Sequence, residues 1–351
     1  MKILINTPDI SLLGGVANHY KGLKDFWTED VKYNFIGSRK NIPGILLIPF
    51  DLIMFFMKCL IFQPNIIVLN PSLGNRAFYR DALFLKISYF LKIKTIVFFH
   101  GWDKEFEKQL SINPQIFQKK YGSATAFIVL ASEFKEVIQS WGIEKPIYMT
   151  TTKVDDKLII DFVFGNKIYY KNILFLARII EEKGVYVALE AFSKICDLFP
   201  DSKLTIVGDG SALFDIRRLV DERTLKNVLI TGPLFGEELK EQFKNADIYI
   251  FPTFYGEGMP TSVLEAMAFG LPIITRPVGG LIDFFDNKKM GYLIDSLNPD
   301  DFAEKITSLF DDQNKIKEIG EFNYQYAKNH FYASNVAVKM ESIFNKEYKN
   351  E

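Results

Sequence analysis

The feature that most constrains the fold of this sequence is a repeated alternation of short apolar runs with longer helical stretches. The runs are continuous, which is typical of strands buried on both faces of a sheet. Parallel strands need a crossover, usually a helix, so the pattern predicts parallel sheets covered on both sides. In the first half we expect strands at 2–6, 33–37, 66–70, 95–100, 126–131 and 147–150, and helices at 14–23, 46–62, 76–92, 113–121 and 132–141.

The alternation stops over 154–171 and then restarts, so we interpret this segment as a linker to a second unit. A length of 351 residues also favours two domains over one. We place the boundary at 164/165. In the second unit we expect strands at 172–177, 203–207, 227–231, 247–251, 271–275 and 291–295, and helices at 184–199, 213–220, 237–245, 263–269, 299–311, 313–330 and 335–346.

Composition excludes several classes of protein. Hydrophobic residues make up 48% and charged residues 24%, as in a globular protein with ample core, and a net charge of −1 argues against general nucleic-acid binding. Residues 1–164 hold 20 Lys and Arg against 15 Asp and Glu, which fits an anionic membrane surface, an acidic acceptor or a solvated surface.

Cys59 and Cys196 lack metal or disulfide spacing, which indicates a reducing compartment. No signal peptide precedes the first strand, so we expect a cytoplasmic chain.

The most apolar run, 45–62, is interrupted by Pro49, Asp51 and Lys58, which makes it a poor membrane span. Two interpretations stay open. It is either a buried or half-buried helix, or a helix that inserts shallowly at a membrane interface.

The stretch 246–280 has the form strand, Gly- and Pro-rich loop, helix. Thr261 and Ser262 offer hydroxyl caps at the helix start, where the first N–H groups have no partner within the helix and therefore suit an anion. Glu257 and Glu265 frame the loop, and carboxylates accept strong hydrogen bonds from sugar hydroxyls. Phosphate flanked by two polyols is the shape of a sugar nucleotide.

Two cations follow the first strand of the second unit. Arg178 ends that strand, and Lys183 lies beside Gly184 where a helix begins. Arginine can bind two phosphate oxygens at once, and lysine acts as a point charge, so the pair suits a diphosphate. The alternative is a surface ion-pair cluster with the neighbouring Glu181 and Glu182.

Other strand ends carry weaker signals. Gly14-Gly15 opens a helix, and this turn either lets the backbone approach a phosphate or is a plain turn without a ligand. His100 lies at a strand end, where open α/β sheets bind ligands, so it is either a site residue or a structural histidine. Gly208 follows a strand, as in a dinucleotide-binding fingerprint, but the third glycine of that fingerprint is absent. We therefore expect a tight turn near a ligand at Gly208 and no nicotinamide site. Gly232-Pro233 either exposes backbone to a nucleobase or is a connector.

No D-x-D triplet occurs in the sequence, so we expect no metal that bridges the diphosphate. Arg178, Lys183 and helix N-termini would then stabilise the leaving phosphate. We expect no cofactor apart from the donor substrate.

At this point the residues resemble a known family, the retaining glycosyltransferases of family 4 (glycosyl transferases group 1). The resemblance covers nearly the whole chain in order, and Ala177 stands where the family usually has glycine. The matching stretches are GGV at 14–16, HGW at 100–102, LARIIEEKG at 176–184, IVGDG at 206–210, TGPL at 231–234 and EGMPTSVLEAMAFGLPII at 257–274.

The resemblance implies a GT-B fold, with two facing Rossmann-like domains and residues 333–351 crossing back onto the first, acceptor-side domain. The domain 165–332 would bind the donor. Arg178 and Lys183 would bind the diphosphate, Glu257 the donor sugar and Glu265 the ribose. Gly15 would approach the diphosphate, and His100 would face the sugar near the reacting carbon. Backbone of Gly258, Met259, Pro260 and Thr261 would lie against sugar and phosphate.

The resemblance further implies transfer of a hexose from a UDP- or GDP-sugar to a glycan or lipid-linked acceptor, with retention and without a metal. We expect a role in bacterial surface polysaccharide synthesis at the inner face of the cell membrane, with peripheral membrane contact through the N-terminal domain. Two rival functions stay open. One is a sugar-nucleotide epimerase of similar fold, which would need paired acid and base residues. The other is a non-catalytic sugar-nucleotide-binding subunit.

Overall fold

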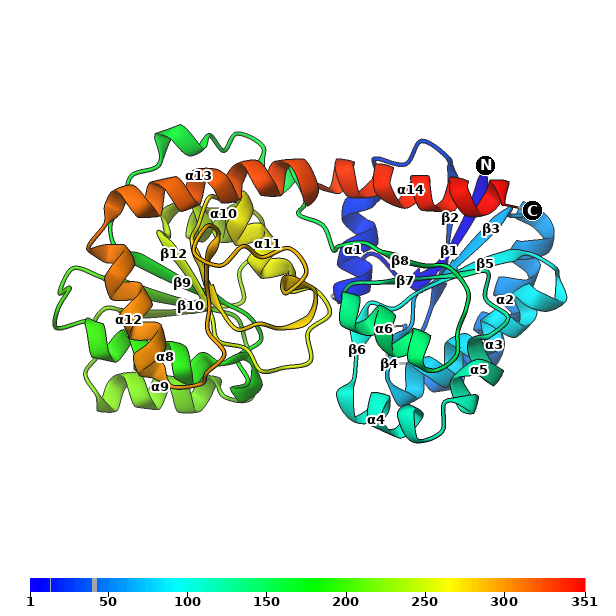
Figure 1. The fold of residues 1–351 in the computed structure, drawn as a ribbon, viewed down its shortest axis with the longest axis horizontal. Helices are drawn as coiled ribbons and strands as arrows, with labels where there is room; N and C mark the ends of the chain where they lie inside the picture. The colour runs from blue at the N-terminus through cyan, green and yellow to red at the C-terminus, as the bar shows by residue number, and fades with distance from the viewer. Residues whose placement is uncertain (13, 40–42, 351) are drawn as a thin grey trace. The chain divides into compact units, whose positions relative to one another are not determined.

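The structure, a computed structural model, describes every residue except 13, 40–42 and 351. By their internal contacts the residues form two compact units, which we describe separately (Figure 1). The first unit comprises Met1–Lys153, Gly256–Met259 and Ala333–Glu351, and the second comprises Val154–Tyr255 and Pro260–Tyr332.

The first unit is built on a six-stranded parallel sheet in the order β2-β1-β3-β5-β7-β8. The chain runs from β1 to one side and then returns for β3, so the strand order reverses between β1 and β3. A two-stranded pair, β4 (Ser72–Leu73) with β6 (Gly101–Trp102), lies beyond the strand ends. The six strands are β1 (Lys2–Pro8), β2 (Asp30–Ile36), β3 (Ile66–Leu69), β5 (Lys94–Phe98), β7 (Ala126–Val129) and β8 (Ile147–Met149).

Helices flank this sheet, and all of the core strand β3 is buried. The sequence pattern predicted five of the six helices between β1 and β8, and it missed α4. That helix is charged and buries only Phe106 and Leu110, so its apolar face is short and narrow. The helices are α1 (Gly15–Leu23), α2 (Gly44–Phe62), α3 (Asn75–Phe90), α4 (Lys104–Ile112), α5 (Gln115–Tyr121) and α6 (Ser132–Ser140).

The second unit has a six-stranded parallel sheet in the order β11-β10-β9-β12-β13-β14. In order of appearance this is 3-2-1-4-5-6, the doubly wound Rossmann order, whose ligand crevice lies where the order reverses. Here that point is between β9 and β12. The strands are β9 (Asn172–Leu176), β10 (Lys203–Val207), β11 (Val228–Gly232), β12 (Ile248–Phe251), β13 (Ile273–Thr275) and β14 (Gly291–Leu293).

The predicted helices of the second unit are present, and short helices add to them. The α-helices are α7 (Asp156–Ile159), α8 (Val185–Ile195), α9 (Leu213–Glu222), α10 (Gly236–Asn245), α11 (Thr261–Ala268), α12 (Pro299–Phe310) and α13 (Gln313–His330). The 3₁₀ helices are η1 (Phe164–Asn166), η2 (Glu181–Lys183) and η3 (Gly279–Leu281).

The predicted boundary at 164/165 lies too late, because the second unit begins at Val154. The segment before 165 packs onto that unit through its aromatic residues. The Phe162 ring lies 4.8 Å from that of Phe269, and the Phe164 ring stacks at 5.9 Å on Tyr324. A β-carbon on Gly270 would be 2.4 Å from Phe164, so this ring fills the space that a side chain would need.

The last helix, α14 (Ala333–Lys349), belongs to the first unit, which confirms the expected return of the C-terminus. Figure 1 shows it, in red, beside α1. The buried Glu341 carboxylate fastens it to the chain before β2. It accepts hydrogen bonds from the backbone N–H of Thr28 at 2.8 Å and of Glu29 at 3.0 Å, and from the Thr28 hydroxyl at 2.7 Å.

Replacing Glu341 by Ala should therefore lower the thermal unfolding midpoint and speed amide exchange along α14. The change leaves two part-buried backbone N–H groups without their acceptor, which costs at most about 1–3 kcal/mol per group because water can reach them in part. Differential scanning fluorimetry and hydrogen–deuterium exchange measure the two effects. Glu318→Ala, at an exposed position of α13, is the matched control and should leave both unchanged. Normal exchange in Glu341→Ala would refute the anchoring role.

Candidate functional site

The two predicted cations lie where the strand order of the second sheet reverses. Arg178 follows β9 by two residues, and Lys183 closes the short helix η2. Arg178 is exposed, whereas Lys183 is 8% exposed. The chain therefore places one exposed and one buried positive charge at the carboxyl end of β9, the end where open α/β sheets bind ligands.

Tyr255 brings the two cations together. Its ring lies 4.2 Å from the Lys183 ammonium and 5.3 Å from the Arg178 guanidinium, both within cation–π range. The carbonyl of Glu182 sets this arrangement, because it accepts hydrogen bonds from the N–H groups of Phe254 at 2.9 Å and Tyr255 at 3.0 Å. The loop after β12 is thus held against the loop after β9.

The predicted alternative, an ion-pair cluster with Glu181 and Glu182, does not describe Arg178. Within the described part of the chain, the Arg178 guanidinium lies over the Tyr255 ring, and no carboxylate forms an ion pair with it. Two exposed carboxylates therefore follow Arg178 in sequence without neutralising it. The guanidinium keeps its charge and its hydrogen-bond donors available on that side of the unit.

Two glycines allow this close packing of loops. Gly184 has φ +80°, and a β-carbon there would lie 2.2 Å from the Pro252 carbonyl oxygen. Gly208 has φ +137°, and its β-carbon would lie 1.9 Å from the Ala177 carbonyl oxygen. Ala177 itself has no positive φ, so alanine fits where glycine is usual in the resembling family. Gly208 also donates its N–H to the Gly232 carbonyl at 2.9 Å, which joins two predicted donor-site turns.

The helix α11 begins at Thr261, two residues before the predicted start at 263, and the expected hydroxyl cap is wrong. Pro260 is the capping residue and supplies no side-chain hydrogen bond. The Ser262 hydroxyl instead accepts a hydrogen bond from the Tyr249 hydroxyl at 2.7 Å, because Tyr249 on β12 lies beneath the helix start. Glu265 lies one turn into α11 and is half-buried.

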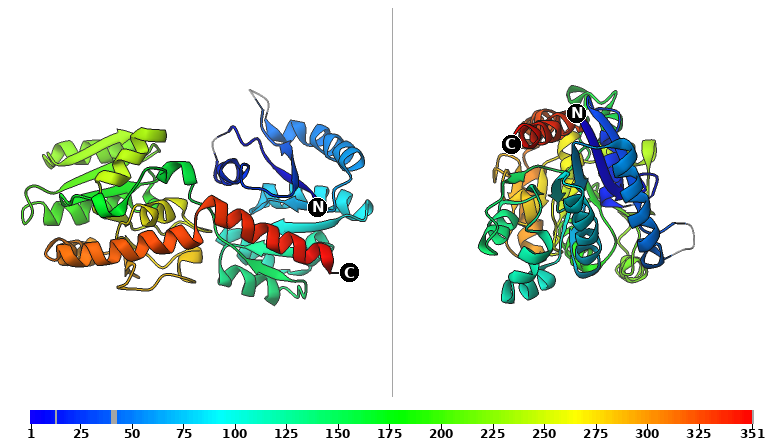
Figure 2. Two further views of the ribbon diagram at one scale, coloured as in Figure 1. Left: turned by 90° about the horizontal axis from the view of Figure 1, so that it is seen from above. Right: turned by 90° about the vertical axis from the view of Figure 1, so that its right-hand side faces the viewer.

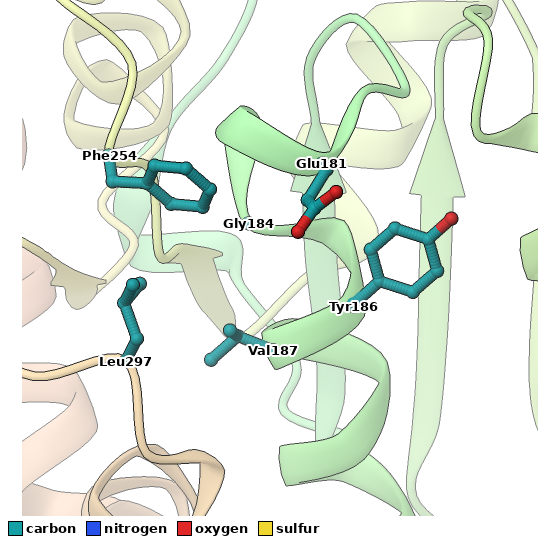
Figure 3. A pocket seen from close by; sticks show the side chains of 6 residues that line it. All are labelled: Glu181, Gly184, Tyr186, Val187, Phe254 and Leu297. Atoms are coloured by element: carbon teal, nitrogen blue, oxygen red, sulfur yellow. The ribbon is translucent and has the colours of Figure 1, made fainter.

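A cavity of about 370 Å³ adjoins η2 (Figure 3). Its lining is mostly apolar, with the Tyr186 ring and the Glu181 carboxylate as polar members. The helix η2 (Glu181–Lys183) therefore contributes the buried Lys183 and also, through Glu181, part of the cavity lining. The lining residues are Glu181, Gly184, Tyr186, Val187, Phe254 and Leu297.

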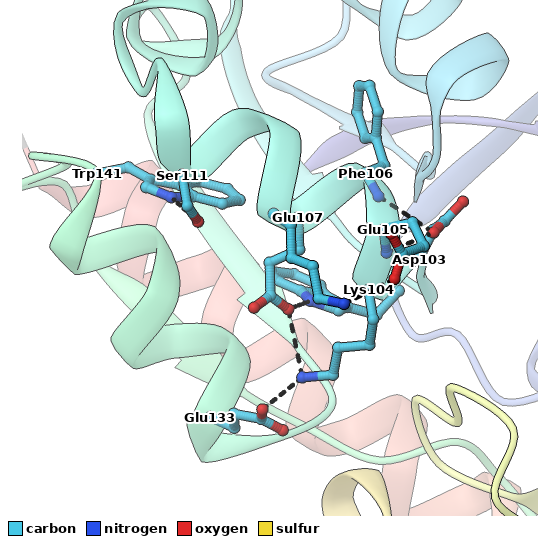
Figure 4. Close-up of polar contacts among 10 residues, drawn as sticks. Asp103, Lys104, Glu105, Phe106, Glu107, Ser111, Glu133 and Trp141 are labelled. Carbon is cyan, nitrogen blue, oxygen red and sulfur yellow. Dashed lines mark hydrogen bonds and ion pairs between the residues drawn. The ribbon is translucent and has the colours of Figure 1, made fainter.

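In the first unit, His100 stands at the start of a firmly held loop. Trp102 stacks on Phe134 with ring centroids 4.1 Å apart, and its Nε1 donates to Glu107. Figure 4 shows the next turn, where Asp103 caps α4 by accepting from the N–H of Glu105 at 3.0 Å. Lys104 forms ion pairs with Glu107 and Glu133. The loop that carries His100 is therefore rigid on its far side.

Asn70, at the end of β3, orients the His100 ring. The Asn70 amide nitrogen donates to the carbonyl of Asn6 at 3.0 Å, so its oxygen must face the other way. That oxygen accepts from the Tyr20 hydroxyl at 2.6 Å and lies 3.0 Å from His100 Nε2. Because the oxygen can only accept, His100 Nε2 carries the proton and Nδ1 is the acceptor.

Burial keeps the histidines of this cluster neutral. Burial lowers the pKa of His100 to about 3 and the pKa of His19 well below its ordinary value. The two rings are 5.0 Å apart, and both nitrogens of the fully buried His19 lack a hydrogen-bond partner in the structure. A neutral His100 can donate or accept a hydrogen bond near pH 7 but cannot supply a positive charge.

The loop Gly256–Met259, which carries Glu257, groups with the first unit and packs on the backbone of 100–102. A β-carbon at Gly258 would lie 2.7 Å from the His100 carbonyl oxygen, and one at Gly256 would lie 2.9 Å from that of Trp102. By contrast, a β-carbon at Gly15 would meet no described atom within 4 Å. Packing inside the unit thus requires glycine at 258 but not at 15.

The structure sorts the predicted site residues into two groups. The first unit holds Gly15, His100, Glu257, Gly258 and Met259. The second holds Arg178, Lys183, Gly208, Gly232, Pro233, Pro260, Thr261 and Glu265. Two residues that position the others were missed, namely Tyr255 and Asn70. Both follow buried strands, and a polar or aromatic side chain at the carboxyl end of such a strand is the signal that could have found them.

Comparisons with known proteins agree with this geometry. Residues 158–326 match the family model described as "Glycosyl transferases group 1". Over 176 residues the chain is 30% identical to the D-inositol 3-phosphate glycosyltransferase of Paenarthrobacter aurescens, which covers 49% of this chain and 43% of that protein. It is also 30% identical over 158 residues to the putative teichuronic acid biosynthesis glycosyltransferase TuaC of Bacillus subtilis, covering 45% of this chain and 38% of TuaC.

The matched regions thus span less than half the length of these curated relatives. Solved structures match over the whole chain. Sucrose-phosphate synthase from Thermosynechococcus elongatus has a TM-score of 0.77 at 16% identity, covering 100% of both chains. HepE of Anabaena has a TM-score of 0.77 at 14% identity, covering 99% of this chain and 100% of that one. The expected GT-B fold, with two parallel-sheet Rossmann-like domains, is confirmed, and the relatives support the glycosyltransferase class.

The neutral histidine cluster predicts how stability depends on pH. The unfolded chain protonates His19 below pH 6.5, but the folded protein does not, so stability decreases as pH falls from about 7 to 4. A histidine that stays neutral in the folded protein therefore lowers the free energy of unfolding by about 2 kcal/mol at pH 5. His19→Phe should therefore show a smaller drop in melting temperature between pH 7.5 and pH 5 than wild type. An equal drop would contradict the assignment, and His330→Gln, at an exposed site, is the control.

Proposed function

We propose that this protein is a retaining glycosyltransferase of family 4 that moves a hexose from a UDP- or GDP-sugar to a glycan or lipid-linked acceptor. The observation that carries the proposal is the pair Arg178 and Lys183, both within cation–π distance of the Tyr255 ring where the strand order of the second sheet reverses. Two cations at such a point suit a diphosphate leaving group. HepE, whose fold this chain shares, has been solved with UDP and with UDP-glucose.

In the proposed reaction the bond between the anomeric carbon and the β-phosphate oxygen of the donor breaks. The acceptor hydroxyl attacks from the same face, and its proton passes to the departing phosphate oxygen. Arg178, Lys183 and the N-terminus of α11 offset the charge that grows on the diphosphate, in place of a metal ion. Across the described residues, no group of three or more His, Cys, Asp or Glu side chains is arranged to hold a metal.

The remaining assignments follow the same proposal. Glu257 binds hydroxyls of the donor sugar, Glu265 binds the ribose, and neutral His100 offers a hydrogen bond near the reacting carbon. Gly208, Gly232 and Pro233 present backbone to the base, and residues 258–261 lie against sugar and phosphate. We further propose that the chain is cytoplasmic and acts in polysaccharide synthesis at the inner face of the cell membrane. The similarity to TuaC supports this role.

The two rival functions predict different products. An epimerase would convert the nucleotide sugar with no acceptor present and would need acid and base groups beside the ring. The ionisable ring of His100 stays neutral because burial lowers its pKa to about 3, which leaves it a poor acid–base partner near pH 7. A non-catalytic subunit would bind the donor without transfer. Glycosyl transfer by the purified chain would exclude both.

Replacing either cation by Ala should lower kcat/KM by roughly 10- to 150-fold. A charge-assisted hydrogen bond contributes about 1.5–3 kcal/mol, and each 1.4 kcal/mol is tenfold. Donor candidates are first ranked by thermal shift with UDP, GDP and their sugars, because a bound ligand raises the melting temperature. Activity is then assayed with the stabilising donor. Arg217→Ala and Lys226→Ala, at exposed positions of the same unit, are the controls. Normal turnover in folded Lys183→Ala would refute the assignment.

Gly15 and Gly208 should respond differently to substitution by Ala. Gly15→Ala should keep the wild-type melting temperature, because the added methyl group meets no described atom, while donor affinity falls at least tenfold. Gly208→Ala should lower the melting temperature, because the methyl group meets the Ala177 carbonyl. Calorimetric titration with the nucleotide identified above measures affinity. Unchanged affinity in Gly15→Ala would remove Gly15 from the donor site.

A further inference from the structure

The helix α2 (Gly44–Phe62) has an apolar face that the protein leaves uncovered. Among the described helices it alone is long and apolar enough, by length and composition, to cross a membrane. Yet Leu46, Ile53 and Ile61 are 71%, 63% and 78% exposed. Phe50 and Leu60 are exposed as well, and these five residues, separated by four, three, seven and one positions, lie on one side of the helix and define the outer face of α2. Monomeric soluble proteins rarely expose such a contiguous apolar surface.

The opposite face of α2 is fastened to the first unit. Phe55, Cys59 and Phe62 are buried, and the Phe55 ring lies 5.1 Å from Phe84 of α3. The buried Asp51 carboxylate accepts a hydrogen bond from the Gly37 N–H at 2.9 Å and forms an ion pair with Arg39 at 2.6 Å. Leaving the unit to span a bilayer would break these contacts, so α2 stays docked and only its outer face is free.

The segment of sequence that contains α2 is rich in basic residues, which suits an anionic surface. Residues 39–94 contain eight Lys and Arg but only two acidic residues, Asp51 and Asp81. Both carboxylates are buried in ion pairs, with Arg39 and Arg80 respectively. The described residues of 39–94 therefore expose no acidic side chain. The neighbouring helix α3 exposes basic and aromatic residues, namely Arg76, Lys86, Tyr79 and Phe90.

We propose that the outer face of α2 is a docking site for an anionic lipid bilayer, with the helix lying in the plane of the interface. Figure 2 shows α2 along the outside of the first unit beside α3. A helix of 19 residues is about 28 Å long, so its outer face meets the interface along its whole length. Lys and Arg near the surface add attraction to anionic headgroups.

A bilayer fits this face better than a protein partner does. The outer face of α2 consists of aliphatic and aromatic side chains and offers no charged group to set the register of a partner chain. Protein interfaces combine an apolar centre with a polar rim and about one hydrogen bond per 100–200 Å². The proposal concerns binding alone and does not depend on glycosyl transfer.

The test is co-sedimentation of the full chain with vesicles, without donor or acceptor. Wild type should bind vesicles of phosphatidylcholine with 30% phosphatidylglycerol, and binding should weaken with pure phosphatidylcholine or in 0.5 M salt, because salt screens the headgroup charge. The double variant Ile53→Glu/Ile61→Glu should reduce the bound fraction at least tenfold. Its exposed positions should leave the melting temperature unchanged. Ile112→Glu, at an 86% exposed site of α4, is the matched control and should bind like wild type.

Three results would overturn the proposal. Wild type binds neither kind of vesicle, or the double variant binds as well as wild type. Alternatively, sedimentation velocity shows wild-type dimers that the double variant abolishes while vesicles are not bound, in which case the face pairs with a second copy. Loss of glycosyl transfer with intact vesicle binding would refute only the proposed function.

Discussion

The candidate site depends on backbone hydrogen bonds that join the two loops at the reversal point of the second sheet. The Glu182 carbonyl accepts from Phe254 and Tyr255, which holds the loop after β12 against the loop after β9. Without this link, neither the Tyr255 ring nor the buried Lys183 would be held in place. Glycine at 184 is the steric condition for it, because the Pro252 carbonyl occupies the space of a side chain.

The hydrogen-bonded cluster around His100 in the first unit is uncharged, unlike the two cations of the second unit. The second unit concentrates positive charge, while the first buries a neutral cluster in which Asn70 fixes the proton of His100 on Nε2. Low dielectric surroundings disfavour the imidazolium form, which is why burial lowers the pKa of this ring to about 3. The second unit thus carries two positive charges close together, and the first carries a fixed, uncharged hydrogen-bonding ring.

Much of the architecture follows from the apolar pattern. Each predicted strand lies on an observed one, and strands buried on both faces, such as β3, β7 and β12, read as continuous apolar runs. The helix α4 was missed because only Phe106 and Leu110 are buried on it. The domain boundary was placed too late, because Phe162 and Phe164 bury their rings on distant residues, which local sequence does not reveal.

The sequence by itself determined the alternation of strand and helix, the cations Arg178 and Lys183, and the two glutamates that frame a helix start. These are local properties, since residue type and spacing carry them. Only the tertiary structure decided strand order, the tautomer of His100 and the exposure of α2. Each depends on groups far apart in the chain. The run 45–62 has the composition of a core helix, and whether its outer face is covered is decided by what else packs there.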